Sequence, residues 1–333
     1  MTESGWLAGG PLFGLPLPEI WFGLMFFILG MFLFLDGFDF GVGALFATRE
    51  DEHERETLLS AIGPFWDGNE VWLVLFGGAM FAAFPRMYAN LFSRHYLLMF
   101  AILGALILRG LAPEMYEQRH DDDWQRWWGR AFVVGSVGAP FFLGIFAANW
   151  LIGATSIVTL PGVLVGLALV ALTVVDGVAF LRLKTRGSLQ QDLARDGYLA
   201  LGAYLVLVVL SLVAIYGTTP RLQSAMLSAP IVGLVVATVV LAGVYAYATR
   251  EDMLYVAFVA GAVMVFGLVA VVAVLLYPSV DPVTGLTVSD AIVSTLPLNI
   301  MTVGVVLLMP LVMLYFVVLY SAFSGPMEAG EAY

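Results

Sequence analysis

The chain of 333 residues is 61% hydrophobic and only 12% charged, with a mean hydropathy of +0.95, which excludes a soluble globular protein. It has no cysteine, so disulfides, thiolate metal sites and cysteine nucleophiles are excluded as well. The formal charge of −11 is carried by loops too short to hold an inserted soluble domain. We therefore expect an all-α integral membrane protein that forms a single transmembrane domain over residues 1–333.

The apolar segments are long enough to cross a bilayer, at about 20 residues each. The first follows an uncharged lead that lacks the basic region of a signal peptide, so we expect the N-terminus to be retained. About nine transmembrane helices are expected. The hydropathy of the second is lowered by Gly63-Pro64 and an acidic pair, and the last carries Pro310, where a helix can kink. They are predicted at 19–46, 58–84, 94–113, 130–153, 158–181, 197–217, 228–248, 253–277 and 297–323.

Basic residues are distributed unevenly between the two sets of alternating loops. Ten lie in loops on one side and three on the other, with Arg109 left inside a span. Because basic loops stay on the cytoplasmic side, this asymmetry predicts an external N-terminus and a cytoplasmic C-terminus. The protein is expected in the plasma membrane as a multi-pass protein.

A short echo indicates an internal repeat. Leu35-Asp36-Gly37-Phe38 near the end of the first span is matched by Val175-Asp176-Gly177-Val178 near the end of the fifth. The repeat units would be 19–153 and 158–277, two four-helix units, with the helix at 297–323 added. Membrane proteins are often built from such repeats, but a four-residue echo in an apolar chain also arises by chance.

Two acidic pairs lie inside the first two spans. Asp36 and Asp39 are three residues apart, as are Asp67 and Glu70, so each pair shares a helix face. A charge near the bilayer centre costs roughly 2.5–3.5 kcal/mol on insertion scales, so such residues usually face a bundle interior and serve a function. One interpretation is that the four acids, with Asn69, line a hydrated route for protons.

Simpler interpretations stay open for these residues. Asp36 and Asp39 could be solvated at the cytoplasmic interface, with nearby glycines serving helix packing. Asp67 and Glu70 could lie near the headgroups at a frayed helix start after Pro64. Arg109 is expected to pair with an acid, Asp67 or Glu70, because an unpaired guanidinium in a span is expensive, or else to extend to the cytoplasmic interface.

No residue pattern predicts a metal or nucleotide site. The three histidines, His53, His95 and His120, fall in loops or at helix ends, whereas haem ligands must project into a bundle interior. Zinc spacing and phosphate-binding glycine loops are lacking. We expect no metal ligand and no catalytic residue in this chain, and no nucleic-acid partner.

Three motifs in order resemble subunit II of the cytochrome bd quinol oxidases. They are 36–43 (DGFDFGVG), 66–73 (WDGNEVWL) and 77–85 (GGAMFAAFP), and the similarity continues at 106–110 (LILRG) and 296–302 (LPLNIMT). It is densest over 30–120, returns at 277–320 and is loose between.

The resemblance implies a haem-free subunit II of a terminal oxidase that oxidises quinol and reduces oxygen to water in the respiratory chain. Its partner, subunit I, would carry two haem b and one haem d, and membrane lipids and a structural quinone could bind to this chain. Asp67 matches the best candidate of the family's proton route, and Asp36, Asp39, Glu70 and Arg109 match positions around it. Asn69 lies within the same motif.

Two other function classes use similar residues. A proton-coupled secondary transporter would also need intramembrane acids, an arginine and a repeat, but it would work alone. A purely structural subunit would leave Asp67 replaceable.

Overall fold

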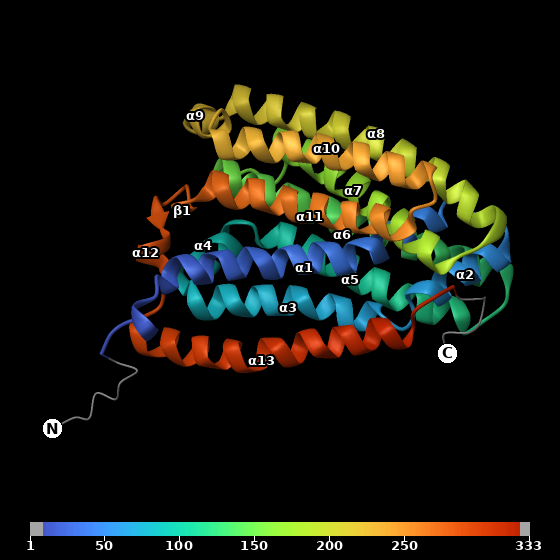
Figure 1. Cartoon of the computed structure of the whole chain (residues 1–333), viewed down its shortest axis with the longest axis horizontal. Coiled ribbons are helices and arrows are strands. Elements are labelled where there is room, and N and C mark those ends of the chain that lie inside the picture. The colour runs from blue at the N-terminus through green and yellow to red at the C-terminus, as the bar shows by residue number, and fades with distance from the viewer. Residues whose placement is uncertain (1–8, 327–333) are drawn as a thin grey trace.

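The computed structural model describes residues 9–326 as a bundle of long helices that run side by side (Figure 1). Eight helices are long and apolar enough to cross a membrane: α1 (Leu17–Phe46), α5 (Tyr96–Glu117), α6 (Asp122–Ile152), α7 (Leu160–Lys184), α8 (Gly187–Thr218), α10 (Ala229–Arg250), α11 (Leu254–Leu276) and α13 (Thr295–Ala322). A ninth, α3 (Trp66–Ala83), lies beside α1 and is less apolar because its first two turns carry Asp67, Asn69 and Glu70. The prediction of an all-α integral membrane protein is confirmed.

Short elements close the two ends of the bundle. They are η1 (Leu12–Gly14), α2 (Glu52–Ile62), α4 (Pro85–Arg94), η2 (Pro220–Leu222), α9 (Gln223–Met226), β1 (Ser279–Asp281), β2 (Leu286–Thr287) and α12 (Val288–Ala291). The two strands pair antiparallel. This small hairpin is the one departure from an all-helical fold among the described residues.

The predicted span at 58–84 is wrong as a single helix. The chain leaves helix α2 at Gly63 and starts α3 at Trp66, because Pro64 has no N–H to donate and restricts the residue before it. Helices α6 and α8 also begin before the predicted apolar segments, because their first turns are polar but helical. Asp121 caps α6 by accepting a hydrogen bond from the Trp124 amide at 3.1 Å. Helix α13 continues through Pro310.

Helices α1 and α7 cross at the centre of the bundle through glycines. A Cβ at Gly41 would lie 2.0 Å from the Thr173 carbonyl oxygen and 2.9 Å from the Gly177 Cα. Helices α6 and α7 meet in the same way, since a Cβ at Gly144 would lie 2.5 Å from the Gly166 Cα. Such backbone contact is the usual way in which membrane helices associate, because lipid gives no hydrophobic force between them.

We propose that the bundle contains the two four-helix units expected at 19–153 and 158–277. Matching α1, α3, α5 and α6 with α7, α8, α10 and α11 in order reproduces the packing. Under this matching the contact α1–α3 corresponds to α7–α8, and α5–α6 corresponds to α10–α11. Likewise α1–α6 corresponds to α7–α11, and α6–α7 corresponds to α11–α1. All of these contacts are present. The α1–α7 contact maps onto itself, which is the behaviour of a pseudo-two-fold axis.

The hairpin is held to α4 by Asp281, whose side chain is buried. The guanidinium of Arg94 donates to both carboxylate oxygens at 2.8 and 3.0 Å, and Asn90 and Thr284 donate at 3.0 and 2.8 Å. Burial by itself would raise the pKa of Asp281, but the hydrogen bonds from Arg94 and Thr284 outweigh it and lower the pKa from 3.8 to about 2.

We predict that Gly41→Ala lowers the stability of the folded chain by about 2–3 kcal/mol, because the new methyl group overlaps the α7 backbone. Gly202→Ala in α8, where a Cβ meets nothing within 4 Å, is the matched control and should be neutral or slightly stabilising. The measurement is thermal unfolding of the purified protein in detergent. Equal melting temperatures for the two variants would contradict the α1–α7 contact.

We also predict that Asp281→Asn destabilises the hairpin at neutral pH by about 1–2 kcal/mol. Since the carboxyl has a lowered pKa when folded, its contribution is complete above the unfolded value of 3.8 and is lost as the pH falls through about 2. Hydrogen exchange of residues 279–291 should therefore distinguish variant from wild type at about pH 7 but not near pH 2. Asp290→Asn, at an exposed residue of the same segment, is the control.

Candidate functional site: a buried charge cluster

The guanidinium of Arg109 on α5 lies at the centre of a cluster of carboxyl groups. Its Nη2 atom is 2.7 Å from Asp36 Oδ1 and 3.3 Å from Asp39 Oδ2, and its Nη1 atom is 3.5 Å from Glu70 Oε2. Only 1% of the Arg109 side chain is exposed, and none of either aspartate. Arg109 therefore does not extend to the interface, and the prediction that it pairs with an acid is confirmed.

Asp36 and Asp39 point inward together because they are three residues apart on α1. The interpretation that they are solvated at the interface is wrong, since α1 continues beyond them to Phe46 and both are enclosed. Aromatic rings cover the guanidinium, with its Cζ 5.1 Å from the ring centroid of Phe40 and 5.6 Å from that of Trp66. Cation–π contacts of this kind stabilise a desolvated cation.

Asn69 and Tyr320 extend the cluster toward α13. The Asn69 side chain donates to Asp39 Oδ2 at 2.9 Å and to the Leu35 carbonyl at 3.1 Å. The Tyr320 hydroxyl donates to Asn69 Oδ1 at 2.8 Å. A continuous set of hydrogen bonds and ion pairs thus joins α5, α1, α3 and α13, and Tyr320 is a member that the sequence did not indicate.

The two acidic side chains of α3, Asp67 and Glu70, point in different directions. Glu70 turns toward Arg109 and keeps 32% of its side chain exposed, whereas Asp67, in the first turn of the helix, is exposed and lies on the outward face. Asp67 therefore does not pair with Arg109, and a helix, α3, does start directly after Pro64 and Phe65, at Trp66. Asp67 begins a stripe of exposed residues on α3: Asp67, Val71, Val74, Gly78 and Phe81.

Asp176 on α7 is a fifth acid of the region, and sequence reasoning recorded it only as part of the repeat. It is fully buried, and neither carboxylate oxygen meets a hydrogen-bond donor in the described part of the chain. Glycines on both sides make room for it, since a Cβ at Gly37 or Gly261 would lie 3.6 or 3.3 Å from its oxygens. An aspartate with apolar neighbours inside a span was the signal that could have identified it.

Acid exceeds base within this cluster. Asp36, Asp39 and Glu70 surround one cation, Arg109, and Asp176 is buried nearby against Gly37 of α1. An uncompensated charge in a dry interior costs several kcal/mol. A balanced ion pair would need one carboxylate. The surplus carboxyl groups are suited to binding and releasing protons.

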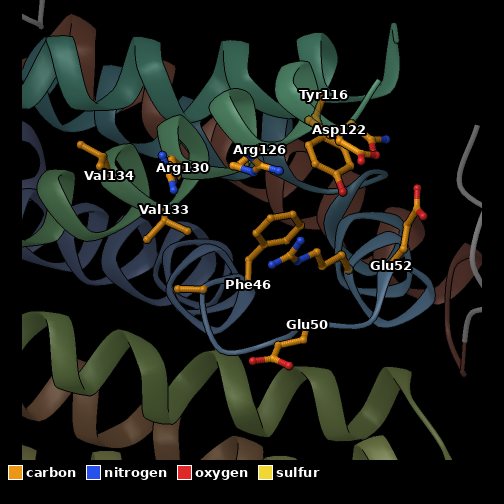
Figure 2. Close-up of a pocket in the computed structure, with 13 residues that line it drawn as sticks. Phe46, Glu50, Glu52, Tyr116, Asp122, Arg126, Arg130, Val133 and Val134 are labelled. Atoms are coloured by element: carbon orange, nitrogen blue, oxygen red, sulfur yellow. The ribbon is translucent and has the colours of Figure 1, made fainter. Parts of the chain in front are cut away.

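A pocket of about 740 Å³ opens at the end of the bundle where α1 finishes and α6 begins. Figure 2 shows Phe46 and Tyr116 facing each other at its centre, with Arg126, Arg130, Val133 and Val134 along one side and Glu50 and Glu52 at its rim. Phe46 lies seven residues after Asp39 and Tyr116 seven residues after Arg109, so the pocket is on the same side of both helices as the cluster.

Residues 9–326 contain no group of three or more His, Cys, Asp or Glu side chains placed to hold a metal ion. His53 belongs to α2, His120 to the loop before α6, and His95 lies between α4 and α5, so no histidine is inside a spanning helix.

The fold and the cluster define a multi-pass membrane protein with buried ionisable groups. Residues 17–323 match the family model described as cytochrome bd terminal oxidase subunit II. The chain is 30% identical to the cytochrome bd ubiquinol oxidase subunit 2 of Bacillus subtilis (strain 168), over 89% of this chain and 92% of that one. It is 28% identical to the cytochrome bd-I ubiquinol oxidase subunit 2 of Escherichia coli (strain K12), over 89% and 91%.

A solved structure has the same fold. A chain in the structure of bd oxidase from Geobacillus thermodenitrificans matches with a TM-score of 0.79 and 16% identity, covering 93% of this chain and 99% of that chain. This chain belongs to the family of cytochrome bd terminal oxidase subunit II. It is therefore one subunit of an oxidoreductase. The family membership that the sequence motifs predicted is confirmed, and the alternative of a secondary transporter has no support.

We predict that Arg109→Leu prevents normal folding and assembly, whereas Arg109→Lys is milder. Removing one partner of a buried ion pair typically costs about 3–5 kcal/mol, since the remaining charge has no compensation, while lysine keeps the charge but loses the forked contact to Asp36 and Asp39. The measurement is the yield of this subunit in membranes. Arg250→Leu, at an exposed cation, is the control, and an Arg109→Leu yield equal to that control would contradict the prediction.

Proposed function

We propose that this chain is the proton-conducting, haem-free subunit of a complex that oxidises quinol and reduces oxygen to water in the respiratory chain. The observation that carries the proposal is the surplus of carboxyl groups around Arg109. The chain itself holds no catalytic residue in this proposal. It contributes scaffold and part of the path by which protons reach the oxygen-reducing site.

The cofactors are assigned to the partner. Haem iron needs ligands that project into a bundle interior, and His53, His95 and His120 all lie outside the spanning helices. The residues of this chain therefore do not fit haem. The proposal assigns two haem b and one haem d to subunit I, with quinol as the substrate of the complex and a quinone also held as a structural lipid.

The outward face of α3 is the surface proposed for subunit I. A charged side chain does not face lipid at low cost, yet Asp67 is exposed on a helix that runs through the bundle. Helix α13, beside α3, is hardly buried within the chain, with 6% of its most apolar window enclosed. A protein partner over α3 would enclose Asp67 next to Glu70, whereas α8 and α10 present apolar faces suited to lipid.

Protons would pass through this chain in a defined order. Asp36 and Asp39 exchange protons within the cluster, Arg109 compensates one negative charge at a time, and Glu70, which is half-enclosed, is the exit toward Asp67 and the partner. Asn69 and Tyr320 keep Asp39 oriented.

The orientation proposed is an external N-terminus and a cytoplasmic C-terminus in the plasma membrane. Most of the basic residues lie at the end of the bundle where α1, α5, α7 and α10 finish. The opposite end of the bundle carries Arg86, Arg94 and Arg221. Basic residues are retained on the cytoplasmic side.

We predict that Asp67→Asn slows oxygen reduction by roughly tenfold, about 1.4 kcal/mol in the barrier, while quinol still reduces the haems of the complex. The amide keeps the size and hydrogen bonding of the carboxyl but cannot carry a proton. Oxygen uptake and haem reduction are measured on the same preparation, with Asp192→Asn, an exposed aspartate of α8, as control. Wild-type turnover in a fully assembled Asp67→Asn complex would favour a purely structural subunit.

A further inference from the structure

The cluster has an exit at Glu70, but Asp36, Asp39 and Arg109 themselves have no exposed surface from which protons could enter. The pocket of Figure 2 is a hollow on the side where α1 and α5 end. Its volume of about 740 Å³ has room for on the order of twenty water molecules. Charged side chains of both signs would keep it hydrated: Glu50, Glu52 and Asp122 with Arg55, Arg126 and Arg130. The Arg55 guanidinium lies over the Phe46 ring, with Cζ 5.3 Å from the ring centroid.

Three aromatic rings form the floor between this pocket and the cluster. Phe46 meets Tyr116 and Phe132 edge to face, with centroid distances of 5.6 Å to each. Gly129 lets α6 approach this floor, since a Cβ there would lie 3.0 Å from Phe46 Cε1. Seven residues of helix separate Phe46 from Asp39, a rise of about 10 Å, which is too far for direct proton transfer.

Ser136 on α6 lies within that interval. It lies one turn beyond Phe132, and 1% of it is exposed. Its side chain packs against Gly43 of α1, since a Cβ at Gly43 would lie 2.0 Å from Ser136 Oγ. Gly43 is one turn after Asp39. The preceding residue, Gly135, packs on the backbone of Arg109, since a Cβ there would lie 2.5 Å from the Arg109 nitrogen. The hydroxyl is therefore placed between the aromatic floor and the charge cluster.

The hydroxyl of Ser136 differs from the buried helix hydroxyls of Ser211 and Thr238. Ser211 and Thr238 donate to the carbonyl four residues earlier, at 2.7 and 2.9 Å, as hydroxyls in helices commonly do. Ser136 Oγ has no hydrogen-bond partner in the described part of the chain. Since buried polar groups are almost always satisfied, an unpartnered hydroxyl between the aromatic floor of the pocket and the charge cluster is suited to binding water.

We propose that this pocket is the proton intake of the subunit, and that Ser136 relays protons through water from the pocket to Asp39 and Asp36. The inference rests on the proposed function of the chain as a proton route. Ser136 accepts a proton from water at Oγ while its own proton passes to the next water or carboxyl group, so it is neutral before and after. Movement of the Phe46 ring opens the floor to water.

The first test is Ser136→Ala in the whole purified complex, with Ser211→Ala as the matched loss of a buried helix hydroxyl. We expect oxygen uptake about fivefold below that of Ser211→Ala, with haem content unchanged, because one relay hydrogen bond is lost. Proton intake should become limiting, so the Ser136→Ala rate should fall at a lower pH than the wild-type rate and show a larger solvent isotope effect. A purely structural role would move neither.

The second test uses the absence of cysteine in this chain. Val133 lines the pocket and Gln191 is exposed on α8, so each is replaced by cysteine in a separate variant. A water-soluble maleimide should attach to the new cysteine in both variants, as measured by the mass of this subunit. We expect attachment at position 133 to slow oxygen uptake about fivefold or more, and attachment at 191 to leave it unchanged. If the Ser136→Ala complex does not assemble, this labelling test decides whether the pocket is the proton intake.

The outcomes distinguish this inference from the proposed function. If Asp39→Asn slows oxygen uptake but Ser136→Ala and the label at 133 behave as their controls do, the intake assignment is overturned and the proton route stands. If none of the three changes affects uptake in an assembled complex, both fall. Slowing by all three, with haem content retained, supports both.

Discussion

The burial of Arg109 is the constraint on which the rest of the structure depends. A guanidinium inside a membrane bundle must have carboxylates within contact, so α1 has to present Asp36 and Asp39 to α5. That requirement fixes the rotation of α1 about its own axis. The opposite face of α1 then meets α7, and the residues available there are Gly37 and Gly41, which allow the backbones to touch. Charge pairing and glycine packing are thus two consequences of one helix orientation.

Close packing also determines the electrostatics of the site. Because α1 touches α7 backbone to backbone and α6 packs its side chains against Gly43 of α1, Asp36, Asp39 and Asp176 are held away from bulk water. Charges interact more strongly in such a medium than in water, and unpaired charges cost more. In the proposed route, proton movement therefore depends on a few specific polar groups, and single positions such as Ser136 and Asn69 gain an importance that they would not have in a wet cavity.

The sequence predicted the spans and the acids but not which groups meet. Hydropathy located eight spans well, because each carries its own apolar signal, and it missed the break at Gly63-Pro64 since α2 ends in apolar residues. That Arg109 pairs with an acid followed from its cost in a span. That the acid is Asp36 rather than Asp67 depends on the rotation of α3 against α5, which no local pattern encodes. Asp176, Tyr320 and Ser136 were missed because their environment comes from other helices.

The arrangement of the cluster argues against a purely structural subunit. An ion pair that only stabilised the fold would be balanced and could be replaced by apolar residues with little loss, often with a gain of about 1–4 kcal/mol. Here three carboxyl groups face one guanidinium, and nearby Asp176 has no donor among the described residues at all. Such a surplus lowers stability unless protons occupy some of the sites. A cluster of carboxyl groups that is stable only when it holds protons, and that lies between the pocket at the end of α1 and an exposed acid on α3, fits the proposed proton route.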